Sequence, residues 1–207
     1  TERVTKAEAE QRRGRAGRVA TGICYRLWTK GEEGALAPHP PAEIQAADLA
    51  GLALELALWG GADLPFLTPP PTAPLAEARA LLEDLGALDQ GRITPHGRSL
   101  GALPLHPRLA HMLLVAGPAA APLAALLEER DPLRGAPPDL ALRLKAITDL
   151  RGYEADHPWP ANRPVLERIR TEAKRLTRAL STDTAQAPPE PLSLGQMAAL
   201  AYPDRIG

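Results

Sequence analysis

The chain has 207 residues, which is enough for one or two domains with a sizeable core. Hydrophobic residues make up 44% of it and charged residues 24%, a balance typical of a globular protein. The single cysteine, Cys24, excludes an internal disulfide framework and a cysteine-based zinc cluster. The histidines show no ligand spacing, so no metal site is predicted. We also expect no membrane segment, no signal peptide and a cytoplasmic location.

Charge is unevenly distributed along the chain, although the formal net charge is only −1. Residues 1–30 hold eight Lys or Arg and three Glu, and residues 163–178 hold six Lys or Arg and two Glu. The remainder is acidic. Phosphate contacts are therefore plausible in two regions, and the whole chain is not a basic coat protein. Aromatic residues make up only 3%, so an aromatic platform for stacking single strands is not expected.

The N-terminal region is predicted to contain one helix and one strand. Residues 5–18 contain good helix formers. Residues 22–28 alternate in polarity, which predicts a strand with one apolar face. That face consists of Ile23, Tyr25 and Leu27. Residues 31–41, which contain glycines and prolines, are predicted to form a loop.

The next segment has the order helix, helix, hairpin, which is the order of a winged helix. A first helix is predicted over residues 42–59, before Gly60, with an apolar stripe at three- and four-residue spacing. The stripe consists of Leu49, Leu52, Leu56 and Trp59. A second helix is predicted over residues 74–85. Gln90-Gly91 is then the turn of a short hairpin, and a further helix begins at about Gly97.

From residue 107 onward the chain is predicted to be helical. Helices are expected at about 107–116, 119–130, 139–151 and 164–180. Residues 181–191 have the composition of a flexible connector, and Ser193 is expected to cap one last short helix. The predicted fold class is therefore mainly α.

The stretch QRRGRAGR, from Gln11 to Arg18, interleaves four arginines with two glycines. On a helix, Gln11, Arg15 and Arg18 are spaced by four and three residues and share one face. Gly14 and Gly17 keep the backbone slim where a ligand or another lobe approaches. Guanidinium groups can stabilise the charge that develops on a phosphoryl group bidentately, which a lysine cannot do.

This stretch resembles motif VI of superfamily 2 helicases, and the wider pattern resembles the DEAH-box RNA helicases of the bacterial HrpB type. GICYRLWT follows it as a strand follows motif VI in that family. PAEIQAADLAGLALELALWG looks like the opening of the family's winged helix, and FLTPPP is similar to a stretch of it. LLEDLGALDQGRITPHGRSLGALPLHPRLAHMLL looks like the end of the winged helix and the start of a ratchet-like helical domain.

The resemblance covers nearly the whole chain and implies a division into three parts. Residues 1–36 would be the end of a second RecA-like α/β lobe, residues 37–104 a winged-helix domain, and residues 105–207 a ratchet-like (HA2-type) helical domain. It also implies a role for three residues of the motif. Gln11, Arg15 and Arg18 would bind ATP, with Arg15 and Arg18 catalytic.

The sequence contains no GxxxxGK[ST] loop to cradle phosphates and no Asp-Glu-x-His. EADH, at Glu154–His157, has the wrong order and follows no apolar strand. We therefore expect a fragment that begins close to motif VI and is inactive as an ATPase on its own. ATP and Mg²⁺ would be used by the intact parent, with no cofactor bound to this chain. Its partners would include the missing RecA-like lobes and RNA, or alternatively single-stranded DNA.

The second basic region is ambiguous. In the family the helical domain lines the RNA channel, which makes four basic residues candidates for nucleic-acid contact. They are Arg168, Lys174, Arg175 and Arg178. In the competing interpretation Glu167 and Glu172 pair with these residues and the face is only solvated.

Two other functions are open at this point. The first is a winged-helix DNA-binding regulator, and the second is an interaction scaffold without affinity for nucleic acid. The predicted helix 74–85 argues against the regulator, because Glu77, Glu83 and Asp84 on its exposed side would repel phosphate.

Overall fold

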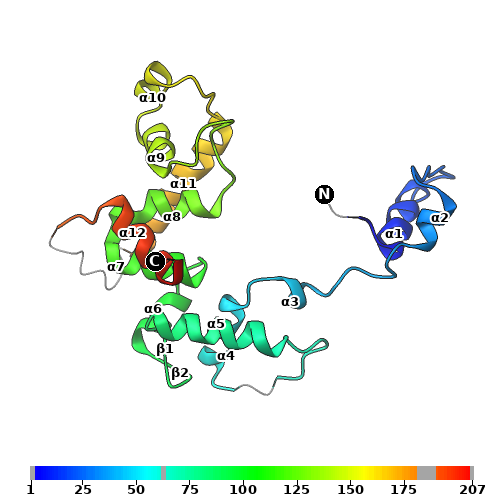
Figure 1. Cartoon of the computed structure of the whole chain (residues 1–207), viewed down its shortest axis with the longest axis horizontal. Helices are drawn as coiled ribbons and strands as arrows, with labels where there is room; N and C mark the ends of the chain where they lie inside the picture. Colours follow the sequence, from blue (N-terminus) through cyan, green and yellow to red (C-terminus); the bar gives the residue numbers. More distant parts are fainter. Residues whose placement is uncertain (1–2, 62–63, 181–189, 206–207) are drawn as a thin grey trace. The chain divides into compact units, whose positions relative to one another are not determined.

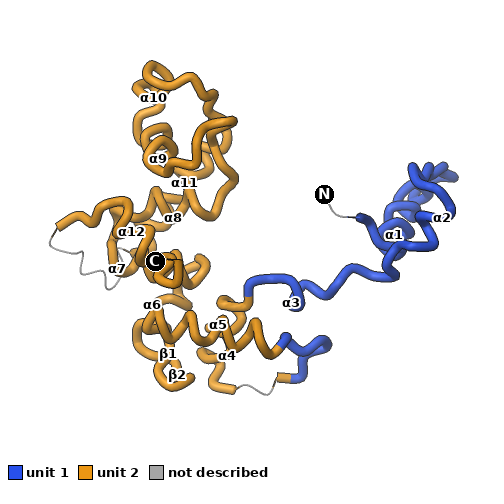
Figure 2. Tube along the Cα trace, viewed as in Figure 1, with its two compact units in different colours: residues 1–48, 65–71 blue, residues 49–64, 72–207 orange. Residues whose placement is uncertain are grey.

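The computed structural model describes residues 3–61, 64–180 and 190–205. The chain divides into two compact units, residues 1–48 with 65–71 and residues 49–64 with 72–207 (Figure 2). Most of the described secondary structure is helical, which confirms the predicted mainly α class (Figure 1). Most of the predicted connector, 181–191, lies outside the described residues.

The described residues of the first unit form three helices. These are α1 (Lys6–Ala16), α2 (Lys30–Gly34) and α3 (Glu43–Ala46). Helices α1 and α2 each begin with a capping box, in which a threonine and a glutamate bond to each other's backbone amide. The start of α1 is held by the segment after α2, because the amide of Lys6 donates to the carbonyl of Ala37 at 2.9 Å.

The sequence prediction was wrong at two places in this unit. Residues 22–28 do not form a strand, and the side chains of Ile23, Tyr25 and Leu27 are 76%, 80% and 93% exposed. A strand needs a hydrogen-bonded neighbour, and the described part of this unit offers none. The predicted loop 31–41 begins within α2, because the capping box at its start stabilises a short helix there.

The second unit begins with two helices, a hairpin and a third helix, in the predicted order. They are α4 (Ala50–Trp59), α5 (Thr72–Asp84), β1 (Leu88–Asp89), β2 (Arg92–Ile93) and α6 (Pro95–Gly101). The antiparallel hairpin pairs Leu88 with Ile93. Its turn, Gln90-Gly91, has φ values of 47° and 74°, as a two-residue turn requires.

The helix predicted over 42–59 is divided into α3 and α4 by an extended residue, Ala47. Helix α3 has four residues and none of them is buried. Packing therefore does not stabilise one continuous helix through this segment. The predicted apolar stripe is confirmed in part, because Leu49 and Leu56 are buried. Leu54, which lies off that stripe, is buried, whereas Trp59 is 75% exposed.

The remainder of the second unit is a set of helices around one core. In chain order the helices are α7 (Pro107–Ala116), the 3₁₀ helix η1 (Gly117–Ala120), α8 (Ala121–Glu128), α9 (Leu140–Thr148), α10 (Leu150–Asp156), α11 (Arg163–Leu180), α12 (Leu194–Ala201) and η2 (Pro203–Arg205). Leu113, Leu123 and Ile169 are among the fully buried side chains. The helix predicted over 139–151 is divided at Asp149, whose carboxylate caps α10.

No membrane segment was expected, but one stretch of the described chain is long and apolar enough to be a candidate by length and composition. The stretch Pro107–Glu128 has 22 residues and a mean hydropathy high enough to cross a bilayer. In the structure it is three successive helices, α7, η1 and α8, and 67% of its apolar 18-residue window is buried in the second unit. Its apolar composition is therefore explained by its place in the protein core.

Helix α12 packs against α7, and an arginine fixes this contact. The guanidinium of Arg108 donates to both carboxylate oxygens of Asp204, at 2.5 and 3.0 Å, and to the carbonyl of Ala201 at 3.2 Å. The same guanidinium lies 5.4 Å from the ring centroid of Tyr202. The end of the described chain is thus tied to the middle of the helical core.

Candidate nucleotide-binding and nucleic-acid-binding residues

The motif QRRGRAGR lies on the last turns of α1 and continues beyond its end. Gln11 and Arg15 are on the helix, four residues apart, and share a face. The helix ends at Ala16 with Gly17 as its C-cap, so Arg18 lies outside it. The prediction that all three side chains share one helical face was therefore wrong for Arg18, because the glycine ends the helix first.

Ion pairs divide the arginines of this region into a paired and an unpaired group. Glu10 pairs with Arg13, and it also accepts from Arg26 at 3.2 Å. Arg26 additionally pairs with Glu33. In contrast, Gln11, Arg15 and Arg18 are exposed and make no side-chain hydrogen bond or ion pair to the described residues. These three polar side chains are available to an anionic ligand.

A close approach follows directly after the motif. A Cβ atom added to Gly22 would lie 1.8 Å from the carbonyl oxygen of Ala16. The segment after Arg18 therefore passes close to the end of α1, and only glycine fits at residue 22.

The four candidate nucleic-acid contacts on α11 divide into two pairs. Arg168 donates from Nε to Glu129 at 2.6 Å, and Arg175 donates from Nη2 to Glu172 at 2.7 Å. Lys174 and Arg178 are exposed and have no ion-pair partner in the described part of the chain. Only Lys174 and Arg178 are thus ready to contact a phosphate without first breaking an ion pair.

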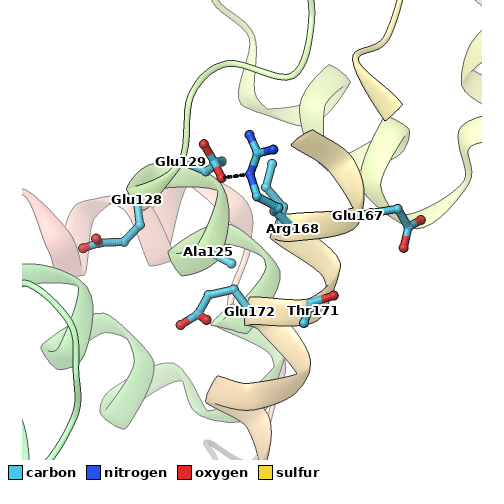
Figure 3. Close-up of a pocket in the computed structure, with 8 residues that line it drawn as sticks. Ala125, Glu128, Glu129, Glu167, Arg168, Thr171 and Glu172 are labelled. Atoms are coloured by element: carbon cyan, nitrogen blue, oxygen red, sulfur yellow. Dashed lines mark hydrogen bonds and ion pairs between the residues drawn. The ribbon is translucent and has the colours of Figure 1, made fainter. Parts of the chain in front are cut away.

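Arg168 lies beside a hollow of about 470 Å³ between α8 and α11 (Figure 3). The hollow is lined by four glutamates, and one of them, Glu129, holds the Arg168 guanidinium (Figure 3). The lining glutamates are Glu128, Glu129, Glu167 and Glu172. The hydrogen bond from Arg168 and one from the Arg130 amide lower the pKa of Glu129 to about 2. A phosphate approaching Arg168 would meet this negative charge.

The other basic residues of α11 have structural roles. Arg170 donates to the carbonyl of Ile147 at 2.7 Å and to Glu167 at 2.7 Å, so it covers the end of α9. Arg163 pairs with Glu154 at 3.1 Å. This glutamate belongs to the EADH sequence, which lies at the end of α10 and its C-cap.

Sequence reasoning missed a contact between two histidines. His96 on α6 and His111 on α7 are joined by a 2.8 Å contact between ring nitrogens, and their rings are nearly perpendicular. Burial and, to a smaller extent, the neighbouring His96 together lower the pKa of His111 to about 4. Within the described residues, no group of three His, Cys, Asp or Glu side chains could hold a metal ion.

The chain was compared with known proteins at the levels of sequence and structure. No protein-family model matches it. It is 41% identical over 137 residues to the ATP-dependent RNA helicase HrpB of Escherichia coli, which covers 62% of this chain and 17% of that protein. It is 40% identical over 116 residues to human DHX34, a probable ATP-dependent RNA helicase, which covers 54% of this chain and 10% of that protein.

The solved structures give a longer match. The crystal structure of the Escherichia coli DEAH/RHA helicase HrpB aligns with 99% of this chain at a TM-score of 0.73 and 31% identity. The match covers 24% of the HrpB chain. The chain is thus similar to the DEAH-box RNA helicases. Its similarity to the HrpB type extends over nearly its whole length, and the chain spans a quarter or less of each of these relatives.

Proposed function

We propose that this chain supplies the arginines of the ATP site and the nucleic-acid-channel domains of an ATP-dependent helicase that acts on RNA. The observation that carries the proposal is the alignment of 99% of the chain with a DEAH/RHA helicase. Gln11, Arg15 and Arg18 support it, because they are exposed and unpaired among the described residues, and an ATP site needs such groups free to meet phosphate.

In this function Gln11 binds the nucleotide, and Arg15 and Arg18 stabilise the charge that develops on the transferred phosphoryl group. ATP and Mg²⁺ are held mainly by parts of the parent protein that carry its phosphate-cradling loop, and the missing RecA-like lobes complete the site. Residues 1–36 contribute to the second lobe, residues 37–104 form the winged helix, and residues 105–207 form the ratchet-like domain. A cytoplasmic location stays a prediction.

RNA is the proposed nucleic acid, and single-stranded DNA is the alternative ligand. On α11 the structure favours Lys174 and Arg178 over Arg168 and Arg175, since the latter two are already paired with glutamates. Of the two glutamates in the competing interpretation, Glu172 pairs with one candidate, Arg175, whereas Glu167 pairs with Arg170. A regulator that reads bases is disfavoured, because Glu77, Glu83 and Asp84 are exposed on α5.

Filter binding with single-stranded RNA tests the proposal against the scaffold alternative. We expect this chain to retain labelled RNA on the filter at low salt and to lose it steeply as salt is raised, because phosphate contacts release counterions. A scaffold without affinity for nucleic acid would retain no RNA at any salt concentration. Retention of duplex DNA with a preference for one sequence would instead favour the regulator.

A further inference from the structure

A second hollow lies in the first part of the second unit, bounded by α4, α5 and the hairpin. Its volume is about 420 Å³. Apolar side chains, among them Leu56, Leu88 and Ile93, line it. Two arginines complete the lining, Arg79 from α5 and Arg92 from β2. The lining residues carry no acidic side chain, in contrast to the glutamate-lined hollow beside Arg168.

Both arginines are exposed, and neither forms an ion pair with the residues that the structure describes. Asp89 lies opposite Arg92 in the hairpin register, but the two side chains form no ion pair with each other. The nearby Glu83 accepts a hydrogen bond from the amide of Gly91 at 3.2 Å and so supports the turn. Two unpaired guanidinium groups beside an apolar hollow favour an occupant that is anionic and has an apolar face.

An aromatic ring adjoins the same hollow. Trp59 is the last residue of α4 and is 75% exposed. The chain then turns at Gly60, whose φ is 82°, and both Gly60 and Gly61 line the hollow. A Cβ atom on Gly61 would lie 3.9 Å from Cδ1 of Trp59, so the indole stands next to the edge of the hollow. This position differs from the sequence expectation, in which Trp59 packs inward.

We propose that this hollow is a binding site for single-stranded RNA, in which Arg79 and Arg92 contact phosphates and a base stacks on Trp59. Arginine together with an exposed aromatic ring is the combination that binds single strands, since each base offers a π-face and each linkage a negative charge. An acidic peptide would satisfy the arginines but would leave the indole without a stacking partner. The inference rests on the proposed function and adds a contact surface to it.

The test uses this chain and a fluorescein-labelled octauridylate, with binding followed by anisotropy between 50 and 200 mM salt. The variant R79Q/R92Q is compared with R98Q/R134Q, which removes two exposed, unpaired arginines elsewhere in the second unit and so matches its charge. We expect R79Q/R92Q to lose about tenfold or more in affinity at 0.1 M salt and about 1.4 units of the log–log salt slope. The control should change little.

The stacking contact is tested separately with Trp59→Ala and Trp59→Phe. We expect the alanine variant to lose about fivefold or more in affinity with an unchanged salt slope, and phenylalanine to restore most of it. Equal losses in R79Q/R92Q and R98Q/R134Q would overturn the site while leaving the proposed function intact. Equal displacement of the oligonucleotide by polyglutamate of the same charge would also overturn it. Absence of any RNA binding by the unmodified chain would overturn both the site and the proposed function.

Discussion

The ring nitrogens Nε2 of His96 and Nδ1 of His111 lie 2.8 Å apart, and this contact connects α6 with α7. A hydrogen bond between two imidazoles needs a neutral ring as its acceptor. Burial lowers the pKa of both side chains, so both are neutral at pH 7 and the bond can form. Asp84 and His111 line the same hollow, and Asp84 is the acidic residue of that lining.

We predict that the second unit loses stability as the pH falls from 7 to 5. The folded state lowers the pKa of His111 to about 4, below the ordinary value near 6.5, so the unfolded chain binds the proton more tightly. The stabilisation is complete above about pH 6.5 and decreases as the pH falls toward 4. Partial exposure limits the effect to the order of 1–2 kcal/mol. Urea unfolding at pH 7.5 and pH 5 measures it, and His111→Gln should flatten the pH dependence.

Substitution of the motif arginines should slow ATP hydrolysis in a full-length helicase that carries this segment. We expect Arg15→Ala or Arg18→Ala to lower kcat by about a hundredfold or more, since each removes a group that stabilises transition-state charge. Arg12 lies off the helical face of Gln11 and Arg15, so Arg12→Ala is the matched control and should lower kcat far less. Similar losses in all three variants would indicate a general electrostatic role instead.

The chain on its own should not hydrolyse ATP. It has no loop to hold the phosphates and Mg²⁺, and arginines outside a complete site have no bound phosphoryl group to stabilise. Phosphate release from the purified chain should equal that of a sample without protein. Release above this background that disappears in Arg18→Ala would contradict the proposed division of the site between this chain and the missing lobes.

The two pairs of basic residues on α11 should differ in their contribution to RNA binding. We expect Lys174→Gln with Arg178→Gln to flatten the log–log salt slope by about 1.4 units, because both residues are unpaired. Arg168→Gln with Arg175→Gln removes the same charge but should flatten it less, because their glutamate partners compete with phosphate. Titrations of single-stranded RNA at four salt concentrations compare the two. Unchanged slopes in both variants would leave α11 outside the RNA path.

Arg143 should be important for stability. Its side chain is 7% exposed and donates to Asp131 at 2.6 and 3.2 Å and to the carbonyl of Asp139 at 3.0 Å. We expect Arg143→Met to lower the free energy of unfolding by about 2–4 kcal/mol, because it leaves these acceptors without their donor. Arg151→Met, at an exposed position in α10, is the control and should change stability by less than about 0.5 kcal/mol. Urea denaturation measures both variants.

Local signals in the sequence predicted the elements that depend on local interactions. The turn at Gln90-Gly91 and the cap at Ser193 were confirmed, because neighbouring residues determine both. The buried face of α11 follows from its helical periodicity. The prediction of a strand at 22–28 was wrong because a strand depends on a partner distant in the sequence. Alternation indicates a strand only where a neighbouring strand exists.

In the candidate site, too, the sequence predicted local features but not contacts between distant residues. The identity of Gln11, Arg15 and Arg18 as a group came from a sequence motif, but the end of α1 at Ala16 depends on which glycine caps the helix. The partner of Arg168 is Glu129, 39 residues earlier, and no periodicity links the two. The position of Trp59 likewise depends on where α4 packs, because helical spacing gives relative faces and not the face that is covered.

The bond from Arg108 to the carbonyl of Ala201 joins residues that are 93 positions apart, and α12 packs against α7 at the same place. During synthesis, α7 therefore leaves the ribosome well before its covering helix does. At bacterial and eukaryotic elongation rates the interval is about 5–20 s, far longer than the time in which helices form. For that period an apolar surface of α7 lacks its covering helix, and we expect chaperones that recognise such surfaces to bind the nascent chain.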